Sequence, residues 1–244
     1  MTEELELVTE DAIRLHARRW DAEGPRRATA VLVHGFAASS TEPRVVAVAE
    51  HLARVGIEVI GYDARGHGRS AGAATLGDLE RFDVAAALAS ANNDEPVVLV
   101  AASVGAIAAL RHVAGEPGSV AGIVTVSCPA RWRLPRNTRG IASALMTQTV
   151  PGRWAARRYA GVRIARPSRR PAPPVELVGL VGVPLAIVHG THDPFILASD
   201  AEALAAAARE PWRLDLVDGM GHAFEPESIE SITRAIDWIL DPGP

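Results

Sequence analysis

The chain has 244 residues, 48% of them hydrophobic, and a formal net charge of −4 at pH 7. This length and composition suit one α/β domain with a large buried core. No apolar run approaches the roughly 20 residues needed to cross a bilayer, and the acidic opening MTEELELVTED lacks the basic start and apolar stretch of a secretory signal. We therefore expect a cytoplasmic protein without a transmembrane segment.

The composition also argues against several kinds of site. All 25 basic residues are arginine, so the lysine of a phosphate-binding loop is missing. No GxGxxG motif follows a predicted strand, and no metal-ligand spacing is present. We expect no cofactor, no metal ion and no nucleic-acid ligand. The single cysteine, Cys128, agrees with a reducing compartment and is expected to be a small buried residue rather than a reactive thiol.

In chain order, the first half alternates short apolar runs, rich in β-branched residues, with longer segments of helical period. The predicted strands are Thr29–Val33, Glu58–Tyr62, Val97–Val100 and Ile123–Val126. The predicted helices are Pro43–Val55, which Gly56 ends, Asp78–Ala91 and Val104–Ala114.

After Cys128 a stretch rich in Arg and Pro interrupts this pattern, which then resumes. The next predicted elements are a strand at Leu185–Val188, a helix at Ala198–Ala208, a strand at Arg213–Val217 and a final helix. In that final helix one apolar stripe is formed by Ile229, Ile232, Ile236 and Ile239. Strands that alternate with helices in this way predict a mostly parallel sheet covered on both faces.

Parallel sheets place their chemistry in the loops at the carboxyl ends of the strands. In this chain those loops contain polar residues that packing alone would not select. They are His34-Gly35-Phe36, the run from Asp63 to Ser70, Ser103, Gly190-Thr191-His192-Asp193 and Gly219-Met220-Gly221-His222. The loop Ser127-Cys128-Pro129, after the fourth predicted strand, carries no acid.

These ordered loops resemble those of the α/β-hydrolase superfamily, and the resemblance covers nearly the whole chain. The string VLVHGFAASSTEPRVVAVAEHLARVGIEVIGYDARGHGRS is similar to the branch that contains monoacylglycerol lipases and related serine esterases. That family keeps its nucleophile, acid and histidine in this order along the chain. The resemblance therefore implies an α/β-hydrolase fold in which Ser103, Asp193 and His222 form a catalytic triad.

The residues around Ser103 fit a nucleophile on a tight turn. A serine between a buried strand and a helix exposes its oxygen only if its neighbours are small, and Ala101 and Gly105 meet this condition. The family pattern is Gly-x-Ser-x-Gly, and alanine replaces the first glycine in this chain. Because alanine is the smallest substitute, we expect the turn to be kept.

The expected chemistry is proton transfer from the serine to a histidine. A neutral imidazole at His222 would take the proton of Ser103, and Asp193 would fix the tautomer of that imidazole. Asp218 lies only four residues before His222 and is a rival for the role of the acid. A simpler interpretation also stays open for two of these residues, with Ser103 as a helix cap and His222 as a loop histidine.

The family resemblance further implies an oxyanion hole built from the backbone N–H groups of Phe36 and Val104. The predicted function is hydrolysis of a small-molecule carboxylic ester through an acyl-enzyme on Ser103. A thioesterase, an amidase, an acyltransferase or a cofactor-free haloperoxidase would use the same residues. A binding protein that has lost catalysis is the alternative of a different class. A structural role in bracing the sheet is expected for His34, Asp63, Arg65, His67 and Ser70.

Residues 129–174 are expected to form a cap over the active site, with 1–128 and 175–244 as the core. The segment contains eleven arginines and no Asp or Glu, so the rest of the chain carries −15 by difference from −4. The cap could pair with the acidic body, or its arginines could face the entrance and attract an anionic substrate. Two roles are expected for the apolar residues of this segment: they line a pocket for an acyl chain, or they pack the cap onto the body. These residues are Trp132, Leu145, Met146 and Trp154.

Overall fold

The computed structural model describes residues 1–92, 94–132, 138–166 and 171–241. Within these residues, eight strands form one sheet in the order β1-β2-β4-β3-β5-β6-β7-β8. The strands are β1 (Thr2–Val8), β2 (Arg14–Trp20), β3 (Ala28–Val33), β4 (Ile57–Tyr62), β5 (Val97–Ala102), β6 (Gly122–Val126), β7 (Leu185–Gly190) and β8 (Trp212–Val217). The pairs from β4 to β8 are parallel, as the sequence predicted, and β2 pairs antiparallel with both β1 and β4.

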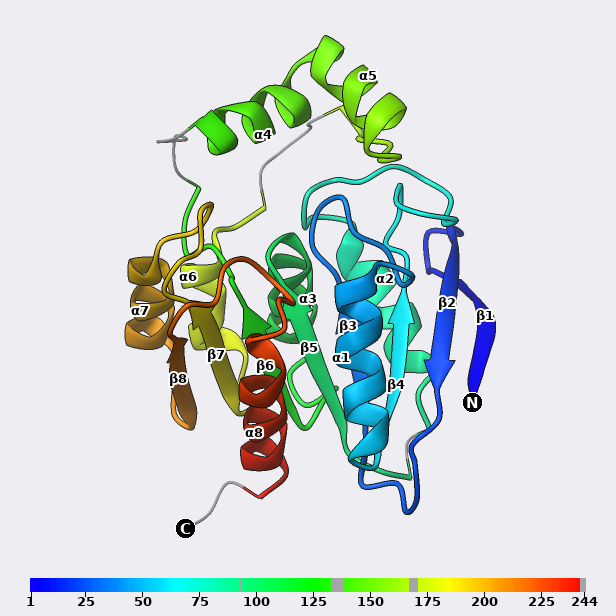
Figure 1. Cartoon of the computed structure of the whole chain (residues 1–244), viewed down its shortest axis with the longest axis vertical. Coiled ribbons are helices and arrows are strands. Elements are labelled where there is room, and N and C mark those ends of the chain that lie inside the picture. The colour runs from blue at the N-terminus through cyan, green and yellow to red at the C-terminus, as the bar shows by residue number, and fades with distance from the viewer. Residues whose placement is uncertain (93, 133–137, 167–170, 242–244) are drawn as a thin grey trace.

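Helices cover both faces of this sheet (Figure 1). Across the described chain they are α1 (Pro43–Arg54), α2 (Glu80–Ala89), α3 (Val104–Gly115), α4 (Thr138–Gln148), α5 (Val150–Tyr159), α6 (Pro174–Leu177), α7 (Ala198–Ala207) and α8 (Ser228–Leu240), with a short 3-10 turn, η1 (Val178–Leu180), after α6. Helices α1 and α8 pack on one face, and α2, α3, α6 and α7 pack on the other. None of the described helices is both long and apolar enough to cross a membrane.

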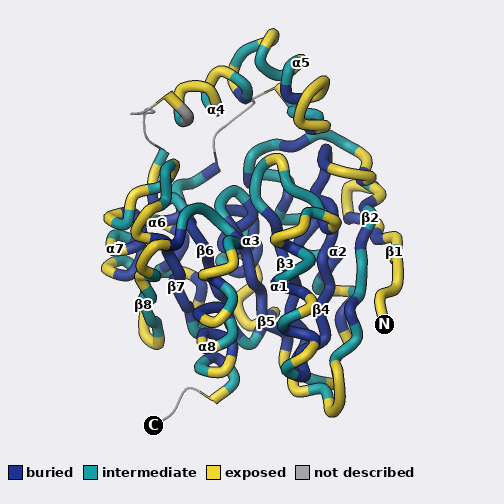
Figure 2. Tube along the Cα trace, viewed as in Figure 1, coloured by how far each residue is buried: buried dark blue, intermediate teal, exposed yellow. Residues whose placement is uncertain are grey.

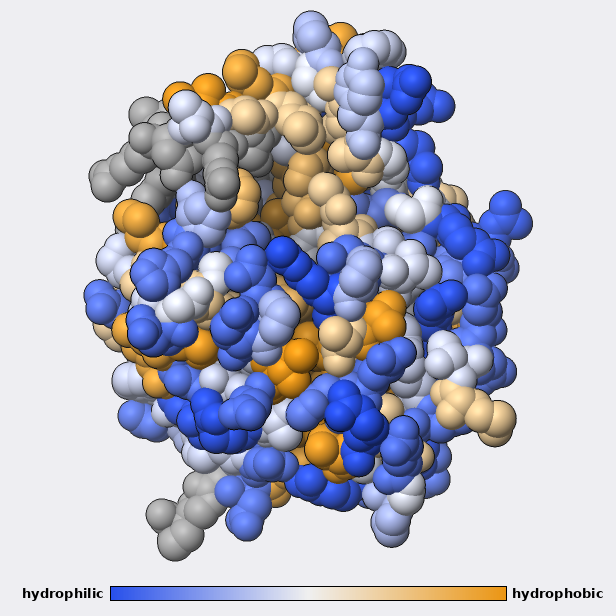
Figure 3. Space-filling model, in the orientation of Figure 1, coloured by the Kyte–Doolittle hydropathy of each residue, from blue (hydrophilic) through white to orange (hydrophobic). Residues whose placement is uncertain are grey.

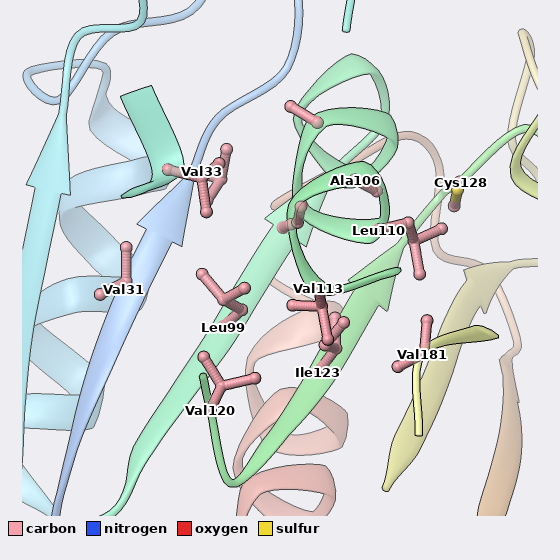
Figure 4. Packing of buried hydrophobic residues seen from close by; sticks show 14 of the residues in the cluster. Val31, Val33, Leu99, Ala106, Leu110, Val113, Val120, Ile123, Cys128 and Val181 are labelled. Carbon is pink, nitrogen blue, oxygen red and sulfur yellow. The ribbon is translucent and has the colours of Figure 1, made fainter. Parts of the chain in front are cut away.

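Burial on both faces of the sheet accounts for the continuous apolar sequences of the central strands. Every residue of β3 to β7 is buried, because helices exclude water from both faces (Figure 2). The parallel register sets Val31 beside Leu99 and Leu99 beside Ile123. Figure 4 shows this row pointing toward α3, where Leu110 and Val113 meet it. The core therefore fixes α3, the helix that follows Ser103, against the middle of the sheet.

The last helix confirms the apolar stripe that the sequence predicted. Ile232, Ile236 and Ile239 are buried in α8, and Ile229 is partly buried beside them. These side chains pack against the face of the sheet that α1 also covers. Burying an Ile side chain contributes about 1.5–3 kcal/mol, so this helix is a substantial part of the core.

Strands β1 and β2 were not predicted. In β1 only Leu7 is buried, because the strand lies at the edge of the sheet and most of its side chains face water. In β2 the buried residues Leu15, Ala17 and Trp20 are separated by charged residues. An edge strand with so few buried positions lacks the apolar run that marks a central parallel strand.

Two helices, α4 and α5, lie within residues 129–174 and stand above the carboxyl ends of the strands (Figure 1). We call Thr138–Tyr159 the α4–α5 hairpin. Exposed apolar side chains gather on it (Figure 3), and they include Ile141, Leu145, Val150, Trp154 and Tyr159. The sequence predicted no helix in this segment, because its many arginines and few buried residues give no clear apolar stripe.

The arginines of residues 129–174 do not pair with the acidic body in the described part of the chain. The ion pairs found there use arginines from outside this segment. Arg163 instead donates to backbone oxygens, those of Gly72 (3.0 Å) and Ser70. Of the eleven arginines counted in the sequence, Arg133, Arg136, Arg169 and Arg170 lie outside the described residues. The side chain of Arg139 lies outside them as well. The six other arginines, Arg131, Arg153, Arg157, Arg158, Arg163 and Arg166, form no ion pair with the described residues of the body.

The loop after β4 is braced by a buried ion-pair network, as its sequence predicted. The Arg65 guanidinium donates to both oxygens of Asp11 at 2.7 and 2.9 Å and to Asp83 at 2.8 Å. Hydrogen bonds from Arg65 lower the pKa of Asp11 to about 2. The side chains of Arg65 and Asp83 are 3% and 0% exposed. Arg65 therefore compensates a carboxylate that water does not reach.

Replacing Arg65 with Met should destabilise the protein by about 3–5 kcal/mol, because it leaves Asp83 buried without its partner. The matched control is Arg69→Met, which removes an ion pair to Glu4 whose two side chains are 64% and 53% exposed. The control substitution should lower the free energy of unfolding by no more than about 1 kcal/mol. Urea unfolding of the two variants measures the difference, and equal losses would contradict the role assigned to Arg65.

Candidate active site

Ser103 occupies a strained turn between β5 and α3. Its backbone has φ 52° and ψ −117°, in a region that residues other than glycine rarely adopt. A Cβ added to Gly105 would lie 2.5 Å from the carbonyl oxygen of His34 and 2.7 Å from that of Val33. The small residue predicted at Gly105 is thus required by the contact between α3 and the end of β3.

Asp193 and His222 come together from the loops after β7 and β8. Their side chains form a hydrogen bond of 2.7 Å between His222 Nδ1 and Asp193 Oδ2. Since a carboxylate accepts, Nδ1 carries the proton and Nε2 is left as a basic nitrogen. The Phe195 ring packs edge-on against His222 at 5.0 Å between ring centroids. The imidazole is therefore fixed in both tautomer and orientation.

The carboxylate of Asp193 is held by more than the histidine. Its other oxygen accepts hydrogen bonds from the backbone N–H groups of Phe195 (2.8 Å) and Ile196 (3.0 Å). Burial raises the pKa of Asp193, but the hydrogen bonds from His222 and these amides outweigh it and hold the pKa below its usual value. Asp193 is therefore an ionised partner for the imidazole.

The rival acid, Asp218, lies elsewhere in the same group of loops. Its side chain accepts a hydrogen bond of 3.1 Å from the Thr191 hydroxyl, and the residue is exposed. The Thr191 oxygen in turn accepts from the backbone N–H of Gly219 at 3.1 Å. Asp218 therefore ties two loops together and is not bonded to His222.

Ser103 and the histidine loop are both tied to the end of β6. The N–H of Ser103 donates to the carbonyl of Val126 at 2.9 Å. The next residue, Ser127, accepts a hydrogen bond of 3.0 Å from the N–H of Ala223, which follows His222. In the described residues no hydrogen bond joins the Ser103 hydroxyl to His222, and in unliganded enzymes this bond is often long and tightens on binding.

Two backbone donors flank the serine. A Cβ added to Gly35 would lie 3.2 Å from the Cβ of Ser103, so the loop His34–Phe36 lies against the serine. Val104 is the first residue of α3, and its N–H is at the positive end of the helix dipole. Within the described part of the chain, the N–H groups of Phe36 and Val104 donate no hydrogen bond to the protein. Both are free to bind an anionic oxygen.

His34 fixes the loop that carries Phe36. Its Nδ1 donates to the carbonyl of Gly35 (2.7 Å), and its Nε2 accepts from the N–H of Ala64 (2.9 Å). Burial and the nearby His67 lower the pKa of His34 to about 4. His34 therefore stays neutral and has the structural role that the sequence predicted.

The four residues predicted to contact substrate lie on the segment above the strands. Trp132 donates its indole N–H to the carbonyl of Pro171 at 2.8 Å. Leu145 and Met146 lie on α4, and Trp154 lies on α5. The side chains of Leu145 and Trp154 are largely exposed, and that of Met146 is half-buried.

Sequence reasoning missed three residues that position the site. Ser127 holds the residue after His222, and Glu225 accepts a 2.9 Å hydrogen bond from the N–H of Gly221, the residue before it. His189 lies buried beneath the acid, with Nε2 3.2 Å from the carbonyl of Ile196. A polar residue at a buried strand end was the available signal for Ser127 and His189. The described residues contain no cluster of three or more His, Cys, Asp or Glu side chains that could hold a metal ion.

Comparisons with known proteins identify the family and the fold. The family model described as "Serine aminopeptidase, S33" matches residues 24–173. Among solved structures, an esterase from Rhodococcus sp. ECU1013 is 21% identical with a TM-score of 0.75, and the match covers 98% of this chain and 99% of the other. An esterase from Pyrococcus furiosus is 18% identical with a TM-score of 0.69, and covers 98% and 89%.

A third structure, an α/β hydrolase from Penicillium sp. sh18, is 18% identical with a TM-score of 0.74 and covers 99% of this chain and 98% of the other. No curated protein sequence matched the chain. At these identities the structural matches bear on the fold, while the family model spans more than half of the sequence. The chain belongs to the serine aminopeptidase S33 family of the α/β-hydrolase superfamily.

Proposed function

We propose that the protein is a carboxylic ester hydrolase that forms an acyl-enzyme on Ser103. One observation carries this proposal, the 2.7 Å hydrogen bond between His222 Nδ1 and Asp193, which in a neutral imidazole leaves Nε2 as the nitrogen that can accept a proton. The family supports a hydrolase, and the esterases among the structural matches favour esters over other acyl groups. The residues involved are Ser103 as nucleophile, His222 as base and Asp193 as the acid that orients it.

The reaction follows from these positions. Nε2 of His222 takes the proton of Ser103 as Oγ attacks the ester carbonyl carbon. The resulting oxyanion accepts hydrogen bonds from the free N–H groups of Phe36 and Val104. The alcohol leaves as its oxygen takes the proton from His222. A water molecule then attacks the acyl carbon and gives its proton to His222, and the released Ser103 recovers the proton.

Residues 129–174 are proposed to act as a cap that receives the substrate. The exposed apolar side chains of the α4–α5 hairpin, including Leu145 and Trp154, would contact an acyl chain. Arg157 and Arg158 on α5 are exposed and form no ion pair with any residue that the structure describes. Arginine binds carboxylates and phosphates with two parallel hydrogen bonds. An ester that also carries an anionic group is therefore the proposed substrate class.

Replacing Ser103 with Ala should lower kcat for a p-nitrophenyl ester by roughly 10⁴- to 10⁶-fold, because no other group can form the acyl-enzyme. Circular dichroism and the thermal midpoint should match the wild type. A fluorophosphonate probe should label the wild type at Ser103 and leave the variant unlabelled. Wild-type protein that fails to react with the probe would point to a binding protein, and full activity of the variant would exclude Ser103 as the nucleophile.

Replacing Asp193 with Asn should reduce kcat by roughly 10³- to 10⁴-fold, because an amide in place of the carboxylate favours the wrong tautomer of His222. The matched control is Asp218→Asn, in the neighbouring loop, which should leave kcat within about twofold because Asp218 bonds to Thr191 instead. Steady-state kinetics of the two variants gives the ranking. The reverse ranking would move the acid to Asp218.

The cap arginines should make catalysis of anionic esters sensitive to salt. For two esters of the same acyl chain, one neutral and one anionic, kcat/KM of the anionic ester should fall much more as salt is raised to about 1 M, where the Debye length is about 3 Å. Replacing both Arg157 and Arg158 with Gln should reduce this difference. The control is Arg54→Gln, at the exposed end of α1 away from the cap. It should leave the difference in salt sensitivity between the two esters unchanged. Equal losses for the two esters would exclude steering by charge.

A further inference from the structure

A small cavity lies directly behind the loop His34–Phe36. It is bounded by that loop, by the ends of β3 and β4, by the segment that carries Ala74 and Leu76, and by Val104 and Gly105 at the start of α3. About 10 Å³ is open to the centre of a water molecule, which is close to the smallest space that holds one water. Phe36 and Val104, whose N–H groups are proposed to bind the oxyanion, both line this cavity.

Tyr62, at the end of β4, lines this cavity and carries a buried hydroxyl that can donate a hydrogen bond. Its side chain is 1% exposed, and its hydroxyl has no partner among the described residues. Burial, together with the nearby carboxylates of Asp83 and Glu80, raises the pKa of Tyr62 far above its usual value, so the phenol keeps its proton. A buried hydroxyl without a partner costs about 1–3 kcal/mol.

His67 lines the same cavity and brings a hydrogen-bond acceptor. Its Nδ1 lies 3.1 Å from the carbonyl of Arg65, and because a carbonyl only accepts, this nitrogen carries the proton. Burial lowers the pKa of His67, so Nε2 stays unprotonated. Nε2 is buried and has no partner in the described chain. His67 therefore needs a donor, as Tyr62 needs an acceptor.

The other polar side chains that line the cavity already have partners. Both nitrogens of His34 are used by Gly35 and Ala64. Both oxygens of Glu80 accept hydrogen bonds from the segment Thr75–Gly77. Among the described side chains that line this cavity, one unmatched donor and one unmatched acceptor therefore remain. Water both accepts and donates, and it fits that space.

We propose that one water molecule binds in this cavity, accepts a hydrogen bond from the Tyr62 hydroxyl and donates one to Nε2 of His67. The His67 ring packs edge-on against Phe36, with ring centroids 6.0 Å apart, and against His34 at 5.1 Å. By fixing His67, the water holds the loop His34–Phe36 in place. Tyr62 and His67 are thus positioning residues for the N–H of Phe36. This last effect, unlike the water site itself, rests on the proposed esterase function.

The test is the substitution Tyr62→Phe, which removes only the hydroxyl. A crystal structure of the wild type should show an ordered water within hydrogen-bonding distance of Tyr62 Oη and His67 Nε2. The variant should melt roughly 2–4 °C lower, the shift expected for the loss of about one hydrogen bond in a chain of this size. If the hydroxyl had no partner, its removal would raise the melting temperature instead, so the sign of the shift decides between the two states.

The chain offers a matched control, because its other tyrosine, Tyr159, is 76% exposed. Tyr159→Phe should leave the melting temperature unchanged. His67→Leu removes the acceptor, and a bridging water predicts that Tyr62→Phe costs less in that background than in the wild type. A wild-type cavity without water density, or a variant that melts at or above the wild-type temperature, would overturn the water site.

Kinetics tests the positioning role separately. Tyr62→Phe should lower kcat roughly tenfold with little change in KM, a smaller loss than the 10²- to 10³-fold that follows removal of an oxyanion donor. An unchanged kcat in a variant that has lost the water would refute the positioning role and leave the water site intact. If the proposed esterase function failed, the wild type would not react with the fluorophosphonate probe or Ser103→Ala would keep full activity. The water density and the melting temperature do not depend on activity, so the two failures can be told apart.

Discussion

The backbone turn at Ser103 is the constraint on which the rest of the site depends. A residue other than glycine held in such a conformation costs about 1–3 kcal/mol, so its surroundings must hold it there. The N–H of Ser103 is bound to Val126 on the neighbouring strand, and Gly105 lets α3 approach the end of β3 more closely than a side chain would allow. The core beneath, where Leu99 meets Leu110, fixes α3 on the sheet. A large part of the fold thus serves to keep one hydroxyl at the edge of the sheet.

The remaining site residues are carried by loops, and hydrogen bonds fix each of these loops. Ser127, at the end of β6, holds the loop of His222, and the backbone of Phe195 and Ile196 holds Asp193. The first contact joins the end of β6 to the loop after β8, 96 residues along the chain, whereas the second lies within the loop after β7. Catalytic loops need support of this kind, since a displacement of about 1 Å is enough to cost much of the rate.

The difference between local patterns and long-range contacts explains what the sequence could and could not predict. Strands β3 to β7 were predictable because burial on both faces leaves continuous apolar runs. The candidate residues Ser103, Asp193 and His222 could be named because they follow such runs in the order that the α/β-hydrolase family keeps. Strand β1 and the α4–α5 hairpin were not, because few of their residues are buried. The role of Ser127 depends on a contact with Ala223, 96 residues away, which no local pattern encodes. Likewise, only the structure brings Tyr62 and His67 to one cavity.

Arginine has opposite roles in the two parts of the molecule. In the body, Arg65 is buried between Asp11 and Asp83, where its charge is compensated and stabilises a loop. On α5, Arg157 and Arg158 lie in the last turn, where the helix dipole favours positive charge, but no carboxylate pairs with them in the described residues. Like charges that stay unpaired repel, and an anion that binds beside them removes that repulsion. Under the proposed function, an anionic ester that binds beside Arg157 and Arg158 would therefore stabilise the hairpin as it binds.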